Sequence, residues 1–442
     1  MGIFFGTDGI RGRACEELTD ALAYKCGNAL GSEKNNATII IGRDTRPSGS
    51  FLSQAFAVGA MSAGANIIDI GICTTPAVAY VTKIVKADFG VMISASHNPS
   101  EYNGIKIFNN GGFKLGDDKE NALERKFVKQ VTVPHYRLGV YKEDLSLINL
   151  YINHLKKVGL SLSGLKIVID ASNGGAYKIA PKIFKSLGAN VIELSCNNDG
   201  KNINNNCGSL YPEKMCNIVK EQNADMGFAF DGDADRIISC DENGDILDGD
   251  IMTFIISKWL KENSKLNKNT VVGTRHTNMG LELELKKDGI TLERTDIGDK
   301  YVLERMLAEN LSLGGEKSGH IILSNYSTTG DGVLCGILLA NICKTKNVNL
   351  SKLASARLYP QCNIDVVVKD KMRVINSDSL SRVINEQEAI LDEHSRIMVR
   401  VSGTEPKVRI MVESLNFSQA ETSAKKIEQV IKNIDGGEIC VE

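Results

Sequence analysis

The chain has 442 residues, of which 42% are hydrophobic and 24% are charged. At about 100–200 residues per domain, this length predicts three or four domains, and the composition argues against a largely disordered chain. Because 52 Lys and Arg residues are balanced by 54 Asp and Glu residues, no overall charge favours nucleic acid or a membrane surface as a partner.

The cysteines and the N-terminal residues bear on the cellular location of the protein. None of the eleven cysteines forms a CxxC pair or a Cys/His cluster, which predicts free thiols in a reducing cytosol. The first residues, MGIFFGTDGIRG, lack the basic region and long apolar core of a signal peptide. No apolar run reaches the roughly 18 residues of a membrane-spanning helix. We therefore expect a soluble, cytoplasmic protein.

A strand–helix–strand pattern occurs three times along the chain. Each copy begins with a short β-branched run that ends in small or polar residues, which is typical of a buried strand opening into a loop. A second strand follows after a stretch with the length of a helix. The strand pairs are 38–41 with 66–70, 166–169 with 190–194, and 270–272 with 290–293. The pattern predicts three parallel βαβ units with right-handed crossovers.

A third strand in each copy leads into a loop with reactive side chains. Residues 87–93 lead into Ser94–Pro99, and residues 224–230 lead into Asp231–Arg236. Both strands begin with Ala-Asp-x-Gly, so the two loops occupy equivalent places, and the third copy has Gly315–His320 there. Because ligands of open α/β sheets collect at the carboxyl ends of strands, we expect the three loops to meet at one central cleft.

The pattern changes after about residue 360. Strand-like runs at 363–368, 396–400 and 408–412 precede a helix in which Ser418 and Glu421 are placed as a capping box. One face of this helix is apolar and is interpreted as a core face: Ala420, Ala424, Ile427, Ile431 and Ile434. This order predicts a small α+β domain.

The predicted fold class is therefore α/β. We expect three similar αβα domains with mixed or parallel sheets around a central cleft, at residues 1–145, 146–248 and 249–360. A smaller α+β domain would follow at 361–442.

Three carboxylates at alternate positions, Asp231, Asp233 and Asp235, form a candidate site for a hard cation. Keeping all three ionised side by side requires a divalent ion, and oxygen ligands favour Mg²⁺, Ca²⁺ or Mn²⁺ over Zn²⁺. A calcium-binding EF-hand is an alternative, but Arg236 stands where its sharp turn needs Gly and the flanks are strands. A solvated acidic turn is the plain structural alternative.

Ser96 lies in the loop equivalent to the acidic one. Its neighbour His97 is not interpreted as a hydrolytic partner, because adjacent residues need not face one another. A plain turn is the usual interpretation of Ser94-Ala95-Ser96. The equivalence to the acidic loop, and Lys106 downstream, instead favour a serine that carries a phosphoryl group.

Two further loops suit a phosphorylated sugar. Arg400 and Arg409 bracket a Ser-Gly-Thr turn, and the planar fork of arginine binds phosphate oxygens in pairs. Glu316, Ser318 and His320 offer a carboxylate, a hydroxyl and an imidazole for sugar hydroxyls and proton transfer. A basic hairpin turn and a structural histidine are the alternatives. The chain has no Walker A sequence, so no nucleotide phosphate is indicated.

In this order, the motifs resemble those of the α-D-phosphohexomutases over essentially the whole chain. The similar segments are 5–12, 94–99, 231–236, 315–320, 328–332 and 400–409. The resemblance implies four domains, one Mg²⁺ per chain and a covalent phosphate on Ser96. It also implies a small hexosamine phosphate as the partner, with neither nucleic acid nor membrane involved.

The resemblance assigns a role to each matching position. It implies that Mg²⁺ is held by the phosphorylated Ser96 with Asp231, Asp233 and Asp235. The groups around the transferring phosphoryl would be Arg11, Lys106, Arg236 and His320. Sugar hydroxyls would bind to Glu316 and Ser318. The substrate's own phosphate would bind to Arg400, Ser402, Gly403, Thr404 and Arg409.

The implied activity is that of an isomerase. It would interconvert glucosamine 6-phosphate and glucosamine 1-phosphate through a bound bisphosphate and so supply amino-sugar precursors. Lys317 and Arg275-His276 depart from the pattern of glucosamine-type members, so mannose or glucose phosphates remain alternative substrates, and a non-catalytic binder of divalent cations or sugar phosphates is a further alternative. Which of Lys106 and His320 is the general base stays open. So does the oligomeric state, with a homodimer as one candidate.

Overall fold

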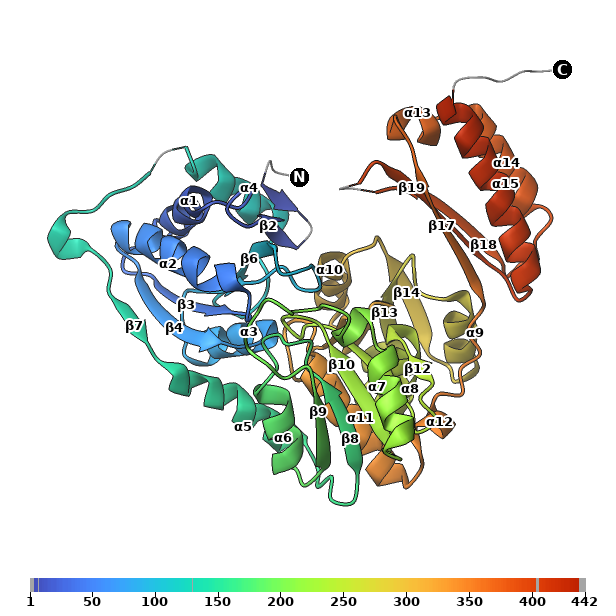
Figure 1. Ribbon diagram of the computed structural model, residues 1–442, viewed down its shortest axis with the longest axis horizontal. Helices are drawn as coiled ribbons and strands as arrows, with labels where there is room; N and C mark the ends of the chain where they lie inside the picture. Colours follow the sequence, from blue (N-terminus) through green and yellow to red (C-terminus); the bar gives the residue numbers. More distant parts are fainter. Residues whose placement is uncertain (1–3, 7, 129, 403–404, 437–442) are drawn as a thin grey trace. The chain divides into compact units, whose positions relative to one another are not determined.

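The computed structural model describes residues 4–6, 8–128, 130–402 and 405–436 (Figure 1). These residues pack into two compact units. The first contains the residues up to 276 together with 288–355, and the second contains 277–287 together with the residues from 356 onward.

Three sheets of the first unit share one strand order. The first has β6–β5–β3–β4 at its centre, the second β11–β10–β8–β9, and the third β16–β15–β13–β14. In each, three strands are parallel and the fourth is antiparallel to the third. The strands are β3 (Thr38–Arg43), β4 (Asn66–Ile72), β5 (Phe89–Ile93), β6 (Tyr102–Asn109), β8 (Lys166–Asp170), β9 (Asn190–Leu194), β10 (Met226–Phe230), β11 (Ile237–Cys240), β13 (Thr270–Thr274), β14 (Thr291–Thr295), β15 (Leu313–Gly315) and β16 (Ile321–Leu323).

Equivalent helices connect the parallel strands in each copy. The first connection contains α2 (Pro47–Ser62), α6 (Ile179–Ser186) or α9 (Met279–Lys287). The second contains α3 (Thr75–Ile84), α7 (Glu213–Glu221) or α10 (Asp299–Glu309). The three predicted βαβ units are therefore confirmed. The sequence did not locate the antiparallel fourth strand, but this strand makes each sheet mixed, which is one of the two arrangements expected.

Other elements extend and cover these sheets. Short strands lie at the edges: β1 (Phe5–Gly6), β2 (Gly9–Arg13) and β7 (Tyr141–Glu143) on the first sheet and β12 (Ile246–Leu247) on the second. The remaining helices are α1 (Asp20–Gly31), α4 (Asp117–Lys126), α5 (Ile148–Val158), α8 (Gly249–Glu262), α11 (Gly332–Lys346) and α12 (Leu350–Leu353). Helix α11 contacts α5, α8, β10 and β11, and its apolar residues are buried on all sides, as expected for a helix that is hydrophobic all round.

The strand interiors explain why the first unit has these layers. Ile39, Ile40 and Ile41 of β3 are fully buried, because a parallel sheet covered by helices on both faces favours a continuous apolar run. Helices α1 and α2 pack with their backbones in contact. A Cβ atom on Gly27 of α1 would lie 2.0 Å from the carbonyl oxygen of Phe56 in α2, so only glycine fits there.

The second unit is a three-stranded antiparallel sheet with helices on one face (Figure 1). Its strands have the order β17 (Gln361–Val367), β19 (Lys407–Glu413) and β18 (Arg396–Val401). The helices that pack on this sheet are α13 (Lys371–Ile375), α14 (Asp378–Glu388) and α15 (Phe417–Gly436). The predicted apolar face of α15 is buried against this sheet, from Ala420 to Ile434, which confirms it as a core face.

The predicted capping box of α15 is wrong. The helix begins at Phe417, and the side chain of Asn416 accepts a hydrogen bond from the backbone N–H of Ser418 at 3.1 Å. Asn416 is therefore the cap, because its short amide reaches the first free N–H groups. Glu421 instead pairs with Lys425 one turn along the helix, at 2.8 Å.

Helix α9 belongs to the second unit, although β13 and β14 on either side of it belong to the first. The backbone N–H of Met279 donates to the Glu413 carboxylate at 2.8 Å, and the Asn278 amide bonds the carbonyl of Tyr359 at 2.9 Å. The four domain ranges expected from the sequence stay predictions. Among the described residues, none of the helices is both long and apolar enough to cross a membrane, and the ten described cysteines are free thiols.

Candidate active site

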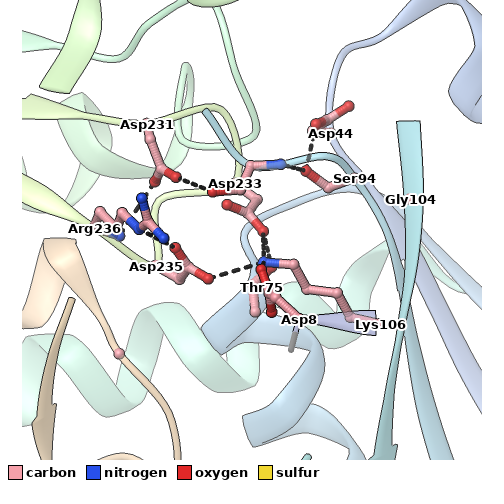
Figure 2. A network of polar contacts seen from close by, with 12 residues as sticks. Asp8, Asp44, Thr75, Ser94, Gly104, Lys106, Asp231, Asp233, Asp235 and Arg236 are labelled. Atoms are coloured by element: carbon pink, nitrogen blue, oxygen red, sulfur yellow. Dashed lines mark hydrogen bonds and ion pairs between the residues drawn. The ribbon is translucent and has the colours of Figure 1, made fainter. Parts of the chain in front are cut away.

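Three loops of the first unit meet at one place, and Figure 2 shows Asp231, Asp233 and Asp235 of the acidic loop near Ser94 and Lys106 of the first copy. They occupy equivalent positions, since each connects the third strand of its copy to the antiparallel fourth. The Ser96 hydroxyl donates to Asp231 Oδ2 at 2.6 Å, and His320 Nδ1 lies 3.7 Å from Asp235 Oδ1. The structure thus brings together the serine loop, the acidic loop and the third-copy loop, as expected from their equivalence.

Ser96 has a backbone conformation that L residues rarely adopt. Its φ is +54°, in the left-handed region, and a residue held there needs support from its surroundings. The hydroxyl of Ser94 accepts the backbone N–H of Ser96 at 2.9 Å. Asn204, from the second copy, donates to the carbonyl of Ser96 at 2.9 Å and to that of Asn98 at 3.0 Å.

Arg46 provides most of that support, although the sequence analysis did not identify it. Its guanidinium is completely buried and donates to backbone carbonyls along the serine loop. The acceptors are Ser96 at 2.9 Å, Asn98 at 2.7 Å, Tyr102 at 2.8 Å and also Pro99. Asp44 holds the other edge of the guanidinium at 2.9 Å and accepts the Ser94 hydroxyl at 2.6 Å.

Asp231, Asp233 and Asp235 form a buried acidic triad. One carboxylate oxygen of each lies within 4.8 Å of the others. Asp233 Oδ1 and Asp235 Oδ1 are buried and make no hydrogen bond, although buried polar atoms are normally paired. Asp233 Oδ2 accepts the hydroxyl of Thr75 at 2.5 Å. Closely grouped carboxylate oxygens without hydrogen bonds fit a hard divalent cation such as Mg²⁺.

Lys106 neutralises part of the acidic charge. Its ammonium lies 2.8 Å from Asp233 Oδ2, 2.9 Å from Asp235 Oδ2 and 3.1 Å from Asp8 Oδ2. Burial opposes the charged form, but these three carboxylates raise the pKa of Lys106 well above its usual value. Burial and the charges of Asp235 and Asp233 raise the pKa of Asp231 well above its usual range, so without a cation this carboxylate resists ionisation.

His97 was set aside in the sequence analysis, but the structure places it beside the serine. Its Nδ1 atom lies 3.3 Å from Ser96 Oγ and 3.1 Å from Nη1 of Arg236. Burial and the neighbouring Arg236 charge lower the pKa of His97 to about 3, so the imidazole is neutral. Arg236 is thereby held next to the serine hydroxyl, while Arg11 pairs with Asp8 nearby.

The third-copy loop is tied to the acidic loop through residues 328–332. The backbone N–H of Gly330 donates to His320 Nε2 at 3.1 Å, which places the proton of a neutral His320 on Nδ1, towards Asp235. The backbone N–H of Gly332 donates to the carbonyl of Ala234 at 3.0 Å. Glu316 is half-buried and Ser318 is exposed on the same loop.

The EF-hand alternative for the acidic loop is wrong. The loop joins antiparallel strands β10 and β11, not two helices. Glu242, which would be the last calcium ligand, accepts a hydrogen bond from Ser351 instead. The triad also does not resemble a solvated turn, because all three aspartates are almost completely buried.

The second unit carries the remaining predicted residues. Arg400 and Arg409 are cross-strand partners on β18 and β19, and Ser402 is buried at the turn between these strands. Arg409 pairs with Glu405 at 2.8 Å. Burial and the adjacent Arg409 lower the pKa of Arg400, as expected for two like charges side by side. Gly403 and Thr404 lie outside the described residues.

Family models match nearly the whole chain. They are described as phosphoglucomutase/phosphomannomutase alpha/beta/alpha domain I at residues 2–132, domain II at 149–244, domain III at 248–360, and the C-terminal domain at 364–430. A phosphoglucosamine mutase of Staphylococcus epidermidis is 44% identical over 447 residues, covering 98% of this chain and 99% of the relative. One from Staphylococcus aureus is 43% identical over 445 residues, with the same coverage of both chains.

Solved structures show the same fold. A phosphoglucomutase/phosphomannomutase family protein from Burkholderia thailandensis has a TM-score of 0.81 at 22% identity, covering 98% of each chain. An N-acetylphosphoglucosamine mutase from Aspergillus fumigatus, in complex with GlcNAc-6P and magnesium, has a TM-score of 0.67 at 17% identity, covering 98% of this chain and 96% of that one. The chain belongs to the phosphohexomutase superfamily, among the bacterial phosphoglucosamine mutases.

Proposed function

We propose that this chain interconverts glucosamine 6-phosphate and glucosamine 1-phosphate, with Ser96 carrying the phosphoryl group. The observation that carries the proposal is the 2.6 Å contact between Ser96 Oγ and Asp231. It places a hydroxyl of the first copy against the candidate cation site of the second. The names of the relatives at 43% and 44% identity support glucosamine phosphates as the substrates.

The reaction takes place in two transfers. The bond between phosphorus and Ser96 Oγ breaks while a bond to the free sugar hydroxyl forms, which gives a bound bisphosphate. The bound bisphosphate then reverses its orientation, and its other phosphoryl group is transferred back to Ser96. The chemistry that a bound Mg²⁺ supplies is neutralisation of charge on the phosphoryl oxygens, and Asp231, Asp233 and Asp235 would hold it. Arg236 and Arg11 stabilise the same developing charge.

We assign the proton transfers to Lys106 and His320. Three carboxylates hold Lys106 as an ammonium, so it donates a proton rather than accepting one. His320 is then the candidate base, and accepting the proton of the sugar hydroxyl requires its Nε2 atom to give up the hydrogen bond from the Gly330 N–H. Glu316 and Ser318 bind sugar hydroxyls. Arg400, Ser402 and Arg409 hold the phosphate that is not reacting, and Gly403 and Thr404 stay predicted members of the same site.

The expected location and assembly are part of this proposal. The ten free cysteines support a reducing cytoplasm. The balance of 52 basic and 54 acidic residues supports a small hexosamine phosphate, rather than nucleic acid or a membrane, as the partner. A homodimer stays a candidate that sedimentation would test.

Turnover of three sugar phosphates tests the proposed substrate. We expect kcat/KM for glucosamine 6-phosphate to exceed the values for mannose 6-phosphate and glucose 6-phosphate by at least about tenfold, since losing one hydrogen bond costs about 0.5–1.5 kcal/mol and about 1.4 kcal/mol is a factor of ten. A preference for mannose or glucose phosphate would contradict the assignment. No turnover of any of them would favour a non-catalytic sugar-phosphate binder.

Ser96→Ala tests the phosphoryl carrier. We expect the intact mass of the purified protein to include a fraction heavier by one phosphate, and this fraction to be absent from the variant along with the mutase activity. Ser100→Ala is the matched control, since it removes a half-buried hydroxyl from the same segment. Phosphate that persists in Ser96→Ala would assign the carrier to another residue.

Arg400→Ala tests the phosphate site of the second unit. Losing one charge-assisted contact should weaken substrate binding by about 1.5–3 kcal/mol, which is roughly a 10- to 100-fold rise in KM. Arg373→Ala is the control, because it removes an exposed arginine from the same unit. An unchanged KM in Arg400→Ala would place the phosphate site elsewhere.

Arg46→Lys tests whether Arg46 positions the serine loop. Lysine keeps the charge but cannot donate to all four carbonyls and Asp44, so Ser96 should lose its fixed orientation. We expect kcat to fall by about 10- to 100-fold, the cost of a small misplacement of a reacting group, with KM little changed. Arg13→Lys on an exposed strand end is the control. A rise in KM with normal kcat would contradict a positioning role.

A further inference from the structure

A second candidate site lies in a cavity of about 390 Å³ between the first and second copies. The carboxyl ends of β3 and β4 form one wall. The segment leading into α5 and the segment leading into α6 form the others, and these two helices pack side by side (Figure 1). No member of the acidic triad lines the cavity, so it is separate from the active site. Its volume falls within the range of small-molecule sites.

The lining combines an apolar floor with a basic rim. The floor is aliphatic: Ile70, Ile72, Leu145, Ile148, Ile152 and Ile179. The basic groups are Arg43, Lys178 and Lys182, against the single carboxylate of Glu143. Arg43 already pairs with Asp69 at 3.1 Å. The two lysines are therefore the charges available to a ligand.

Lys178 and Lys182 lie one helical turn apart at the start of α6. Within the described part of the chain, neither ammonium forms an ion pair, and Lys178 lies over the ring of Tyr177 at 5.2 Å. Like charges at positions i and i+4 repel each other. An anion between them would relieve this repulsion, while an apolar body would cover the aliphatic floor.

The walls of the cavity continue into the active site. The backbone N–H of Gly175, which lines the cavity, donates at 2.7 Å to the carbonyl of Gly232, between Asp231 and Asp233. A Cβ atom on Gly175 would lie only 2.1 Å from the carbonyl oxygen of Cys73, so the backbone is closely packed at this wall. On the opposite wall, Arg43 immediately precedes Asp44, which holds Arg46.

We propose that this cavity is an effector site for a small organic anion with an aromatic or aliphatic body, and that its occupation strengthens cation binding by the acidic triad. A ligand that touches both copies stabilises the arrangement in which Ser96 meets Asp231. Because coupling between two sites is reciprocal, a cation at the triad must tighten the binding of this anion by the same factor.

The fluorescent anion 8-anilinonaphthalene-1-sulfonate is a suitable probe. Titration should show one site per chain. We expect the affinity for the probe to fall at least tenfold in Lys178→Gln/Lys182→Gln. The affinity should also fall in Leu145→Asp, because the new carboxylate repels the anionic probe from the apolar part of the cavity. Lys214→Gln/Lys220→Gln is the matched control, since it removes two exposed lysines of α7. Equal binding by the two double variants, or displacement of the probe by glucosamine 6-phosphate, would overturn the site.

The coupling between the cavity and the acidic triad is tested by a separate binding measurement. This measurement requires no catalysis, so its result does not depend on which substrate the enzyme uses. Binding of Mn²⁺ can be followed by electron paramagnetic resonance with and without saturating probe. We expect about fivefold tighter Mn²⁺ binding with the probe, at the lower end of common coupling factors, and no such gain in Lys178→Gln/Lys182→Gln. An Mn²⁺ affinity that the probe leaves unchanged in the unsubstituted protein would overturn the coupling.

Discussion

The active site depends on several carboxylates that stay ionised although they are buried and shielded from water. An unpaired buried carboxylate costs several kcal/mol, and here Asp8, Asp233 and Asp235 surround one ammonium. Lys106 belongs to β6 of the first copy, whereas Asp233 and Asp235 belong to the second. The ion pairs therefore hold the two copies together at the place where the serine must meet the acidic loop.

Asp233 and Asp235 use their two carboxylate oxygens in different ways. Each gives Oδ2 to Lys106 and keeps Oδ1 without a hydrogen bond. The ammonium can thus stabilise the loop without using the oxygens that suit a metal ion. Removing the lysine would leave buried negative charge uncompensated.

The repeated fold explains why chemically different loops converge. In each copy the loop follows the third strand and turns back into an antiparallel fourth strand, which fixes where it emerges from the sheet. The same position carries Ser96 in the first copy, the acidic triad in the second and His320 in the third. The same backbone arrangement therefore presents the proposed phosphoryl carrier, the candidate cation site and a polar loop in the three copies.

Much of this arrangement could be predicted from the sequence because it depends on local patterns. Buried β-branched runs predicted the parallel strands, and the shared Ala-Asp-x-Gly predicted that the serine and acidic loops are equivalent. The support around them could not be predicted. Arg46 reaches carbonyls about fifty residues away, Thr75 bonds an aspartate of another copy, and the direction of His97 depends on Arg236; such contacts exist only in the folded chain. The capping box failed because the helix begins earlier than expected: Asn416 accepts the N–H of Ser418, so Ser418 lies inside the first turn instead of capping it.

Backbone strain shows what these long-range contacts do. Ser96 and Ala234, one in each facing loop, both have φ near +55°, which costs roughly 1–2 kcal/mol for a residue with a Cβ atom. Buried hydrogen bonds offset the strain: Arg46 and Asn204 hold the Ser96 carbonyl, and Gly332 holds that of Ala234. The hydroxyl is therefore aimed at Asp231 before a substrate arrives, and little reorganisation is left for the transfer itself.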